Sequence, residues 1–344
     1  MNDIIKWGII GLGNVAHEFA KSFYNIKNAQ LVAIASKTRN NLIKFKDEFE
    51  IDRDNCYDDY EKLLKNNEVD IIYLALPNCF HSEWIYKAIE NKKHILVEKP
   101  AFMNFKDAQK VFNHPNIDNL FFGEGFMFRY HPQITKVLEL IKSEQIGKIT
   151  SMESVFGKDL LTKKKFFGFL KSKKLDKKKR IFNKSLGGGV ILDHGSYTVS
   201  MSLLMASLVE GLDIKNFSLS LDKKINIIEG IDMESSVELI LDNKFQSSLK
   251  ASFLNNIGSH TTINGENGKI EIQNTWNSET GQIYLNDNKK NLLEIKNTKN
   301  LYTLEIEKIS NDILNNKTEA SYPGTSKNEI LIGSKILDKW LNAN

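Results

Sequence analysis

The sequence predicts a doubly wound α/β domain followed by an α+β domain with a large, open, mostly antiparallel sheet. Over the first ~120 residues, apolar runs alternate with helix-like segments and no repeat recurs at a fixed period, which is typical of a parallel sheet with helices on both faces. After about residue 125, alternating strands follow one another, separated by turn signals such as Asp242-Asn243 and Asn264-Gly265. A length of 344 residues fits two domains of ~100–200 residues each.

The elements of the first domain follow in order. Short apolar runs at residues 4–10, 31–35, 69–76, 94–97 and 120–122 indicate strands that are covered on both faces. A helix follows the first run, because Ala16, Phe19, Ala20 and Phe23 recur at helical spacing. A lysine-rich helical stretch runs to Phe49, and another helix is expected over residues 83–90.

The second domain begins with a helix over residues 132–143, opened by Pro132 in its first turn. Strands are expected at residues 151–156, 217–221, 234–241, 245–253, 269–272, 282–285 and 292–295. A final helix, residues 326–342, is expected to pack back on the body. We therefore assign residues 1–122 and 123–325 to two domains and residues 326–344 to the closing helix. No linker rich in proline, glycine or serine separates them.

Composition excludes several classes of protein. Apolar residues make up 41% and charged residues 26% of the chain, as in ordinary globular domains. The net charge of +4 balances 47 basic against 43 acidic residues, so we expect no nucleic-acid partner. No apolar run reaches transmembrane length and the N-terminus lacks export features, so we expect no membrane partner and a cytoplasmic location. Cys56 and Cys79 show neither disulfide nor metal spacing, and we expect no metal site.

A glycine-rich turn directly follows the first predicted strand and opens the first helix. Its residues fit the pattern G-x-G-x-x-G/A: Gly11-Leu12-Gly13-Asn14-Val15-Ala16. In this context the glycines allow backbone N–H groups to approach a pyrophosphate, which the helix N-terminus stabilises. The pattern predicts a Rossmann domain, with cofactor contacts from Gly11, Gly13, Asn14 and Val15.

The end of the second strand favours NADP over NAD. NAD-binding domains usually place a carboxylate there, but this chain has Ser36-Lys37-Thr38-Arg39 and no acid before Asp47. A hydroxyl and two cations suit a 2′-phosphate, since charge-assisted hydrogen bonds can form where a carboxylate would repel it. We therefore expect NADP contacts from Ser36, Lys37 and Arg39, with NAD as the alternative. A basic helix start without a ligand would give the same pattern.

Two further segments carry chemically useful side chains. Glu98-Lys99-Pro100 follows the fourth strand, at the edge where ligands bind in such sheets. Taken alone, the segment is better interpreted as a surface lysine before a helix start with Pro100 in its first turn. The second segment runs from Gly187-Gly188-Gly189 to Tyr197 and contains Asp193 and His194. The i, i+4 spacing puts Asp193 and Tyr197 on one helix face, and the glycines suggest a close backbone approach to a ligand or to the other domain. A glycine-rich connection with an ordinary buried tyrosine is the alternative interpretation.

Five ordered motifs together resemble the Gfo/Idh/MocA family of NAD(P)-dependent oxidoreductases over essentially the whole chain. Besides the glycine turn, Glu98-Lys99-Pro100 and the segment 187–197, they are Leu76-Pro77-Asn78 with His81, and residues 124–132. The tyrosine at position 197 replaces the histidine of many members. It resembles the branch containing dimeric dihydrodiol dehydrogenases, glucose–fructose oxidoreductases and some xylose dehydrogenases.

The resemblance implies hydride transfer between a nicotinamide and a carbinol or carbonyl carbon of a sugar, polyol or cyclic diol. Lys99 and Tyr197 would act at the reacting oxygen, with Asp193 orienting the substrate or the lysine. Further cofactor contacts are implied for Leu76, Pro77, Asn78, His81, Glu98, Lys99 and Arg129. Substrate contacts are expected from Lys99, Phe128, Arg180, Asp193, His194 and Tyr197. The basic stretch from Lys171 to Arg180 could steer an anionic substrate. Pairing of open sheets in this family implies a homodimer or homotetramer.

Two alternatives remain open at this level. A glycosidase of the same fold would use NAD transiently and accumulate no reduced cofactor. A non-catalytic sensor of NADP or of a sugar nucleotide would bind ligand without turnover. The segment 36–39 and Tyr197 argue against the glycosidase, and the set of Lys99, Asp193 and Tyr197 argues against the sensor. The sequence identifies neither the substrate nor the direction of the reaction.

Overall fold

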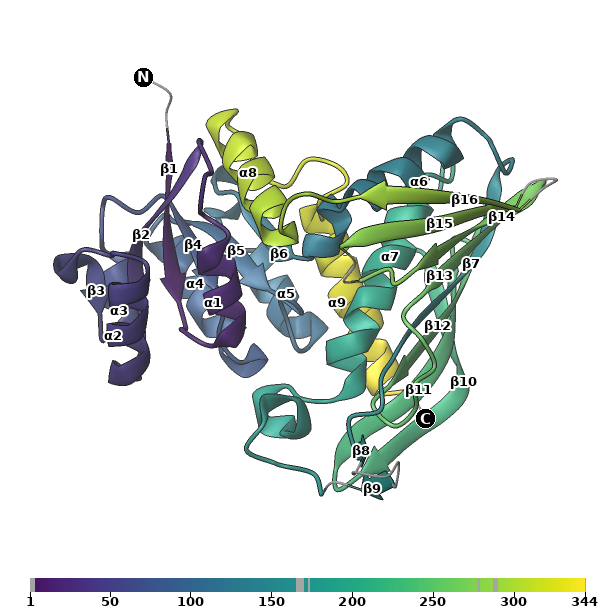
Figure 1. The fold of residues 1–344 in the computed structure, drawn as a ribbon, viewed down its shortest axis with the longest axis horizontal. Helices are drawn as coiled ribbons and strands as arrows, with labels where there is room; N and C mark the ends of the chain where they lie inside the picture. The colour runs from purple at the N-terminus through teal and green to yellow at the C-terminus, as the bar shows by residue number, and fades with distance from the viewer. Residues whose placement is uncertain (1–3, 165–169, 173, 277–278, 287–289, 344) are drawn as a thin grey trace. The chain divides into compact units, whose positions relative to one another are not determined.

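The computed structural model describes residues 4–164, 170–172, 174–276, 279–286 and 290–343, and the chain divides into two compact units. The first unit comprises residues 1–131 and 298–331, and the second comprises residues 132–297 and 332–344. Each unit is built around its own sheet (Figure 1). Among the described helices, none has the length and apolar character needed to cross a membrane.

The first unit contains the parallel sheet that the sequence predicts. Its strands follow the order β3-β2-β1-β4-β5-β6, and all neighbouring strands run parallel, the arrangement of a dinucleotide-binding Rossmann fold. The strands are β1 (Ile5–Ile10), β2 (Ala29–Ala35), β3 (Cys56–Tyr57), β4 (Ile71–Leu74), β5 (His94–Glu98) and β6 (Phe122–Gly125). The helices are α1 (Asn14–Lys21), α2 (Arg39–Glu48), α3 (Tyr60–Leu64), α4 (His81–Glu90), α5 (Phe105–Phe112) and α8 (Leu301–Leu314).

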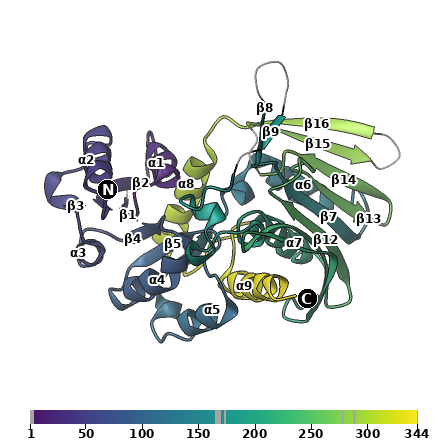
Figure 2. The same ribbon diagram turned by 90° about the horizontal axis from the view of Figure 1, so that it is seen from below.

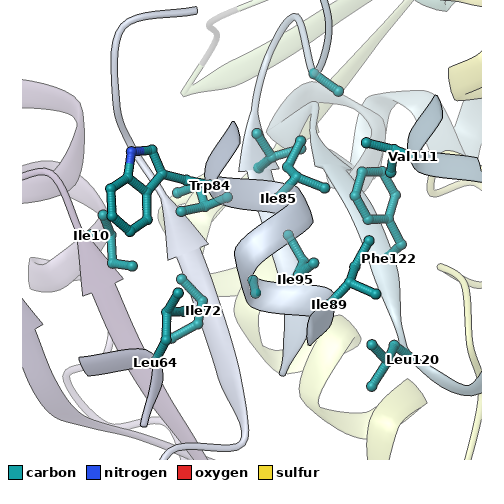
Figure 3. Close-up of a cluster of buried hydrophobic side chains, with 14 of the residues drawn as sticks. Ile10, Leu64, Ile72, Trp84, Ile85, Ile89, Ile95, Val111, Leu120 and Phe122 are labelled. Atoms are coloured by element: carbon teal, nitrogen blue, oxygen red, sulfur yellow. The ribbon is translucent and has the colours of Figure 1, made fainter. Parts of the chain in front are cut away.

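Apolar side chains cover this sheet on both faces. On one face, Ile85 and Ile89 of α4 lie against Ile95 of β5, with Phe122 of β6 close by (Figure 3). On the other face, strand residues pack with α1, α2 and α8; this cluster includes Ile9, Tyr73, Leu96, Phe19, Phe45, Ile306 and Ile309. Successive buried residues of a strand alternate between the two clusters, so the buried part of each strand is apolar on both sides.

The second unit contains an eight-stranded sheet in the order β10-β11-β12-β7-β13-β14-β15-β16. Only the β12–β7 pair is parallel among these described neighbours. Figure 2 shows α6 and α7 inside the curve of this sheet. The strands are β7 (Ile149–Gly157), β10 (Phe217–Ile228), β11 (Ile231–Leu241), β12 (Phe245–Ser252), β13 (Thr261–Gly265), β14 (Gly268–Gln273), β15 (Thr280–Asn286) and β16 (Lys290–Lys296). The hairpin β8 (Thr162–Lys164) and β9 (Leu170–Ser172) and the helices α6 (Pro132–Lys142), α7 (Ser196–Ala206) and α9 (Lys327–Leu341) complete the set.

The fold class is confirmed, but the domain boundaries differ from the predicted 1–122, 123–325 and 326–344. The segment Thr298–Leu331 belongs to the first unit, because the apolar face of α8 packs against β1, β2 and α1. The last helix is divided at Leu331, with Ile330 in the core of the first unit and Trp340 bonded to Ser235 in the second. The sequence analysis also missed α3, α5, α8, β3, β8, β9 and β13.

Candidate active site

The glycine-rich turn has the geometry of a phosphate-binding loop. Gly11 has φ +92°, and a Cβ there would lie 2.6 Å from the Ala75 carbonyl oxygen, so only glycine fits. A Cβ at Gly13 would meet nothing within 4 Å, and Asn14 and Val15 are exposed at the start of α1. Their backbone N–H groups lie in the first turn, where no intrahelical acceptor exists. The turn therefore leaves open space in front of free helix donors, as a pyrophosphate requires.

The end of β2 lies beside an apolar cavity of about 390 Å³. Leu76, Pro77 and Phe80 line it, together with Lys37, Tyr60, Glu83 and Trp84. The Lys37 ammonium lies 5.4 Å from the Tyr60 ring centre, and the Glu83 carboxylate is paired with Lys87 at 3.0 Å. The buried Ser36 hydroxyl accepts a hydrogen bond from the Thr38 N–H at 3.1 Å. Apolar walls and an adjacent cation suit a flat ring that carries an anionic group.

Lys99 lies on a loop that neighbouring side chains hold in place. The fully buried His81 ring places Nδ1 2.9 Å from the Pro100 carbonyl oxygen and Nε2 2.8 Å from that of Leu76. The Ala101 N–H donates to Glu124 at 2.8 Å, and the Lys99 N–H donates to Glu98 at 3.2 Å. The Lys99–Pro100 peptide bond is cis. His81 therefore joins the two loops and does not offer its ring to a ligand.

Buried acids surround this loop. Tyr73 donates a hydrogen bond to Glu98, and burial raises the pKa of Tyr73 well above its usual value. Loss of hydration raises the pKa of Glu124 to about 7. Glu305 of α8 is fully buried, and burial together with the charge of Glu98 raises its pKa well above the ordinary range. These side chains favour their protonated forms because a buried charge loses its hydration.

In the second unit, Asp193 and Tyr197 lie at the start of one long helix. Residues Ile191–Gly195 form a π-helical turn that continues directly into α7, and π-turns often occur at functional sites. Tyr197 is buried, with its ring 5.4 Å from that of Phe156 and 5.5 Å from that of Trp276. Arg180 donates to Asp193 at 3.1 Å. The structure thus brings Arg180 against Asp193, and Tyr197 lies four residues further along the same helix.

The triple glycine is explained by contacts inside the second unit. A Cβ at Gly188 would lie 2.3 Å from the Arg180 carbonyl oxygen. Gly189 has φ +122°, and a Cβ there would lie 2.0 Å from an oxygen of Asp232. At Gly188 and Gly189 the close backbone approach is therefore made within the second unit, and not to a ligand or to the other domain as the sequence suggests.

Three other predicted contacts are better explained by packing. The buried His194 ring stacks on the Phe156 ring, with 3.7 Å between the two ring centres. Phe128 is fully buried, 5.9 Å from the Phe126 ring. Arg129 is fully buried and donates to Glu329 at 2.9 Å and to the Pro323 carbonyl at 3.2 Å. These contacts favour structural roles over the ligand contacts that we expected. Lys173 in the predicted basic stretch lies outside the described residues.

Sequence reasoning missed the side chains that support the site. Asp232, Phe156 and Trp276 surround the 187–197 segment but are distant in the sequence and carry no motif. Glu124 stood inside a motif without an assigned role. For Asp232, only its place between a turn at Gly230 and a strand is visible in the sequence.

Comparisons with known proteins agree with the geometry. The family model described as "Oxidoreductase family, NAD-binding Rossmann fold" matches residues 5–122, and the Gfo/Idh/MocA C-terminal domain model matches residues 134–271. The trans-1,2-dihydrobenzene-1,2-diol dehydrogenase of Xenopus tropicalis is 26% identical over 81% of this chain and 78% of its own. The dTDP-3,4-didehydro-2,6-dideoxy-alpha-D-glucose 3-reductase of Saccharopolyspora spinosa is 26% identical over 80% of this chain and 76% of its own.

A solved structure shows the same fold over the whole chain. The 3-ketoreductase of Actinomadura kijaniata, in complex with NADP and TDP-benzene, has a TM-score of 0.79 at 20% identity and covers 98% of this chain and 97% of its own. Two family models therefore match most of the chain, with a Rossmann sheet and an open sheet in the expected order. We conclude that the chain belongs to the Gfo/Idh/MocA family and is an NAD(P)-dependent oxidoreductase.

Proposed function

We propose that this chain is an NADP(H)-preferring oxidoreductase that transfers a hydride between a nicotinamide and a carbinol or carbonyl carbon of a sugar, polyol or cyclic diol. The observation that carries the cofactor preference is the basic end of β2, where Lys37 lines the cavity and Arg39 begins α2. A 2′-phosphate would gain charge-assisted hydrogen bonds there. The relatives named above act on a diol or on a sugar nucleotide, and the 3-ketoreductase was solved with NADP, which supports both halves of the proposal.

The residues present fit such a cofactor. The open space at Gly13 and the first-turn N–H groups of α1 would hold its pyrophosphate. Leu76, Pro77 and Phe80 would enclose its adenine ring in the cavity. When bound, the nicotinamide supplies or accepts the hydride, which is chemistry that no protein side chain provides.

We assign the proton chemistry to Lys99 and Tyr197. In the reducing direction, the Tyr197 hydroxyl would donate its proton to the oxygen as the carbonyl becomes an alkoxide. The Lys99 ammonium would hydrogen-bond the same oxygen and favour the tyrosinate that remains. Asp193 would orient the substrate hydroxyl or Lys99. The loop contacts from His81 and Glu124 support this assignment, because they fix the backbone beside Lys99.

Substrate class and assembly follow as further parts of the proposal. Arg180 lies beside Asp193. As a cation near the reacting groups, it favours a substrate that carries a negative charge. The face of the eight-stranded sheet turned away from α6 and α7 would pair two subunits into a homodimer or homotetramer.

The free thiols of Cys56 and Cys79 are half-buried, and burial raises the pKa of Cys56 to about 11, which suits inert thiols in a cytoplasmic protein.

Parallel titrations of cofactor-stripped protein with NADPH and NADH, followed by nicotinamide fluorescence, test the proposal. We expect tight binding of NADPH and weak binding of NADH. A screen of sugars and diols with NADP would then identify the substrate. A preference for NADH would overturn the assignment of Ser36, Lys37 and Arg39 and make the glycosidase alternative the better one. Binding of neither cofactor would contradict the function as a whole.

A further inference from the structure

The side chain of Asp232 connects the open sheet to the helix that carries Asp193 and Tyr197. It lies at the start of β11, and its carboxylate accepts a hydrogen bond from the Ile191 N–H at 2.8 Å. The Val190 N–H also lies close enough to lower the pKa of this carboxylate. Both N–H groups belong to the first turn of the continuous helix formed by the π-helical turn and α7, so the hydrogen bond to Ile191 lets a distant strand cap this helix N-terminus.

The fit around the Asp232 carboxylate is tight. Any Cβ at Gly189 would collide with its oxygen at 2.0 Å. The helix itself starts here, since the Asp193 N–H donates to the Gly189 carbonyl at 3.1 Å. A carboxylate at this helix N-terminus is favoured by the charge-assisted hydrogen bond from Ile191 and by the helix dipole. The contact therefore fixes the position of the first helical turn relative to β11.

We propose that Asp232 is a positioning residue, which holds the first turn of this helix so that Asp193 and Tyr197 are placed for reaction. Asp193 comes three positions and Tyr197 seven positions after Val190 in the same continuous helix. A movement of the first turn would therefore displace both side chains. Catalytic groups need placement to within about 0.5 Å. This inference rests on the proposed catalytic roles of Asp193 and Tyr197, but the anchoring itself can be measured without substrate.

The protonation state of Asp232 gives the proposal a specific signature. Burial raises the pKa of Asp232 to about 6, against the lowering effects of the backbone N–H groups and of Lys184. Above this pH the carboxylate accepts the Ile191 N–H with a full charge, and below it that charge is lost. The elements around Asp232 carry these other charged or titratable groups: Arg180, Lys184, Asp193, His194, Tyr197, Asp222, Lys223, Lys224, Glu229, Glu234, Glu238 and Lys250.

Asp232→Asn keeps the shape of the side chain and one acceptor oxygen but removes the charge. We expect hydrogen exchange of the peptide covering residues 188–199 to become at least tenfold faster in this variant, measured by mass spectrometry without cofactor or substrate. Asp242→Asn is the matched control, because Asp242 also accepts a backbone N–H in the second unit, from Asp213 at 3.2 Å. Equal exchange in Asp232→Asn and wild type would overturn the anchoring.

The kinetic readout separates positioning from a merely structural role. With the substrate found by the screen, Asp232→Asn should lower kcat about tenfold at pH 8, leave the Kd for NADPH unchanged and change KM less than threefold. Wild-type kcat should fall toward that of the variant below pH ~6, whereas the variant should lack this step. Glu124 titrates in both proteins, so their difference isolates Asp232. Unchanged kcat and pH profile in a variant with faster exchange would refute positioning.

Failure of the proposed function has a different signature. In that case wild-type protein shows no turnover with any carbonyl or alcohol, while the exchange experiment still reports on the anchor. Faster exchange in Asp232→Asn alone would then support the anchor and contradict only the catalytic assignment. Asp232→Ala, which removes both acceptor oxygens, should exchange faster still.

Discussion

At the scale of single residues, the proposed chemistry depends on the phenol of Tyr197. Tyr197→Phe keeps the ring contacts with Phe156 and Trp276 and removes only the proton donor. We expect turnover to fall about 10²–10⁴-fold, the usual contribution of a general acid, with NADPH affinity within twofold of wild type. Steady-state kinetics and fluorescence titration measure the two quantities. Tyr284→Phe is the control, and a similar loss in that variant would point to a general loss of structure.

The cofactor preference is also decided by a few side chains. Lys37→Ala combined with Arg39→Ala removes both cations at the end of β2. Each charge-assisted hydrogen bond contributes about 1.5–3 kcal/mol, so we expect NADPH affinity to fall at least 10–100-fold and NADH affinity to stay within twofold. Lys21→Ala, a cation at the end of α1, is the control. Equal weakening for both cofactors would mean that these cations do not contact the 2′-phosphate.

At the scale of elements, Arg129 and Glu329 join the segment after β6 to the start of α9. Arg129 is fully buried and its partner is 13% exposed. Arg129→Met would leave a nearly buried carboxylate without its cation, which typically costs about 3–5 kcal/mol. Chemical denaturation should show this loss. The double variant with Glu329→Gln should recover part of it, whereas no recovery would show that the two side chains contribute independently.

The sequence predicted best those elements whose hydrophobic pattern is enough to show which of their faces are buried. A strand such as β4 is apolar throughout because helices cover both faces of its sheet. By contrast, β13 reads Thr261-Thr262-Ile263-Asn264-Gly265 and ends in what resembles a turn. It is nevertheless a central strand, paired with both β7 and β14. Its position depends on partners far away in the chain, which no local pattern records.

In the candidate site, too, the features set by local spacing were predicted and the contacts between distant residues were not. The glycine turn, the basic end of β2 and the helix that carries Tyr197 follow from local spacing and lie where the sequence predicts. The supporting contacts do not, because His81, Glu124 and Asp232 act on backbone groups that are 19, 23 and 41 residues away. Arg129 shows the opposite error: its motif suggested a ligand contact, but burial against Glu329 favours an internal ion pair.

At the scale of the whole molecule, the acids with raised pKa values predict how stability changes with pH. The pKa is raised to about 7 for Glu124, to about 6 for Asp232 and well above its ordinary value for Glu305. The same groups in the unfolded chain titrate near 4. Between these limits the native state binds more protons than the unfolded state, so stability falls as pH rises.

We expect the free energy of unfolding to decrease by roughly 2–4 kcal/mol between pH 5 and pH 8. Urea unfolding at constant ionic strength measures this trend. Glu124→Gln retains an oxygen for the Ala101 N–H and should flatten the curve. Stability that rises with pH over this range would contradict the burial of these carboxyl groups.

The assignment of residues 298–331 to the first unit has a consequence for biosynthesis. Residues 1–131 leave the ribosome first, but Ile306, Ile309 and Ile313 of α8, which cover one face of their sheet, are made after all the strands of the second unit. Until then, that face of the nascent sheet exposes apolar surface, the condition in which chains aggregate or recruit chaperones. The unit whose synthesis begins first is thus completed only after residue 331 has been added.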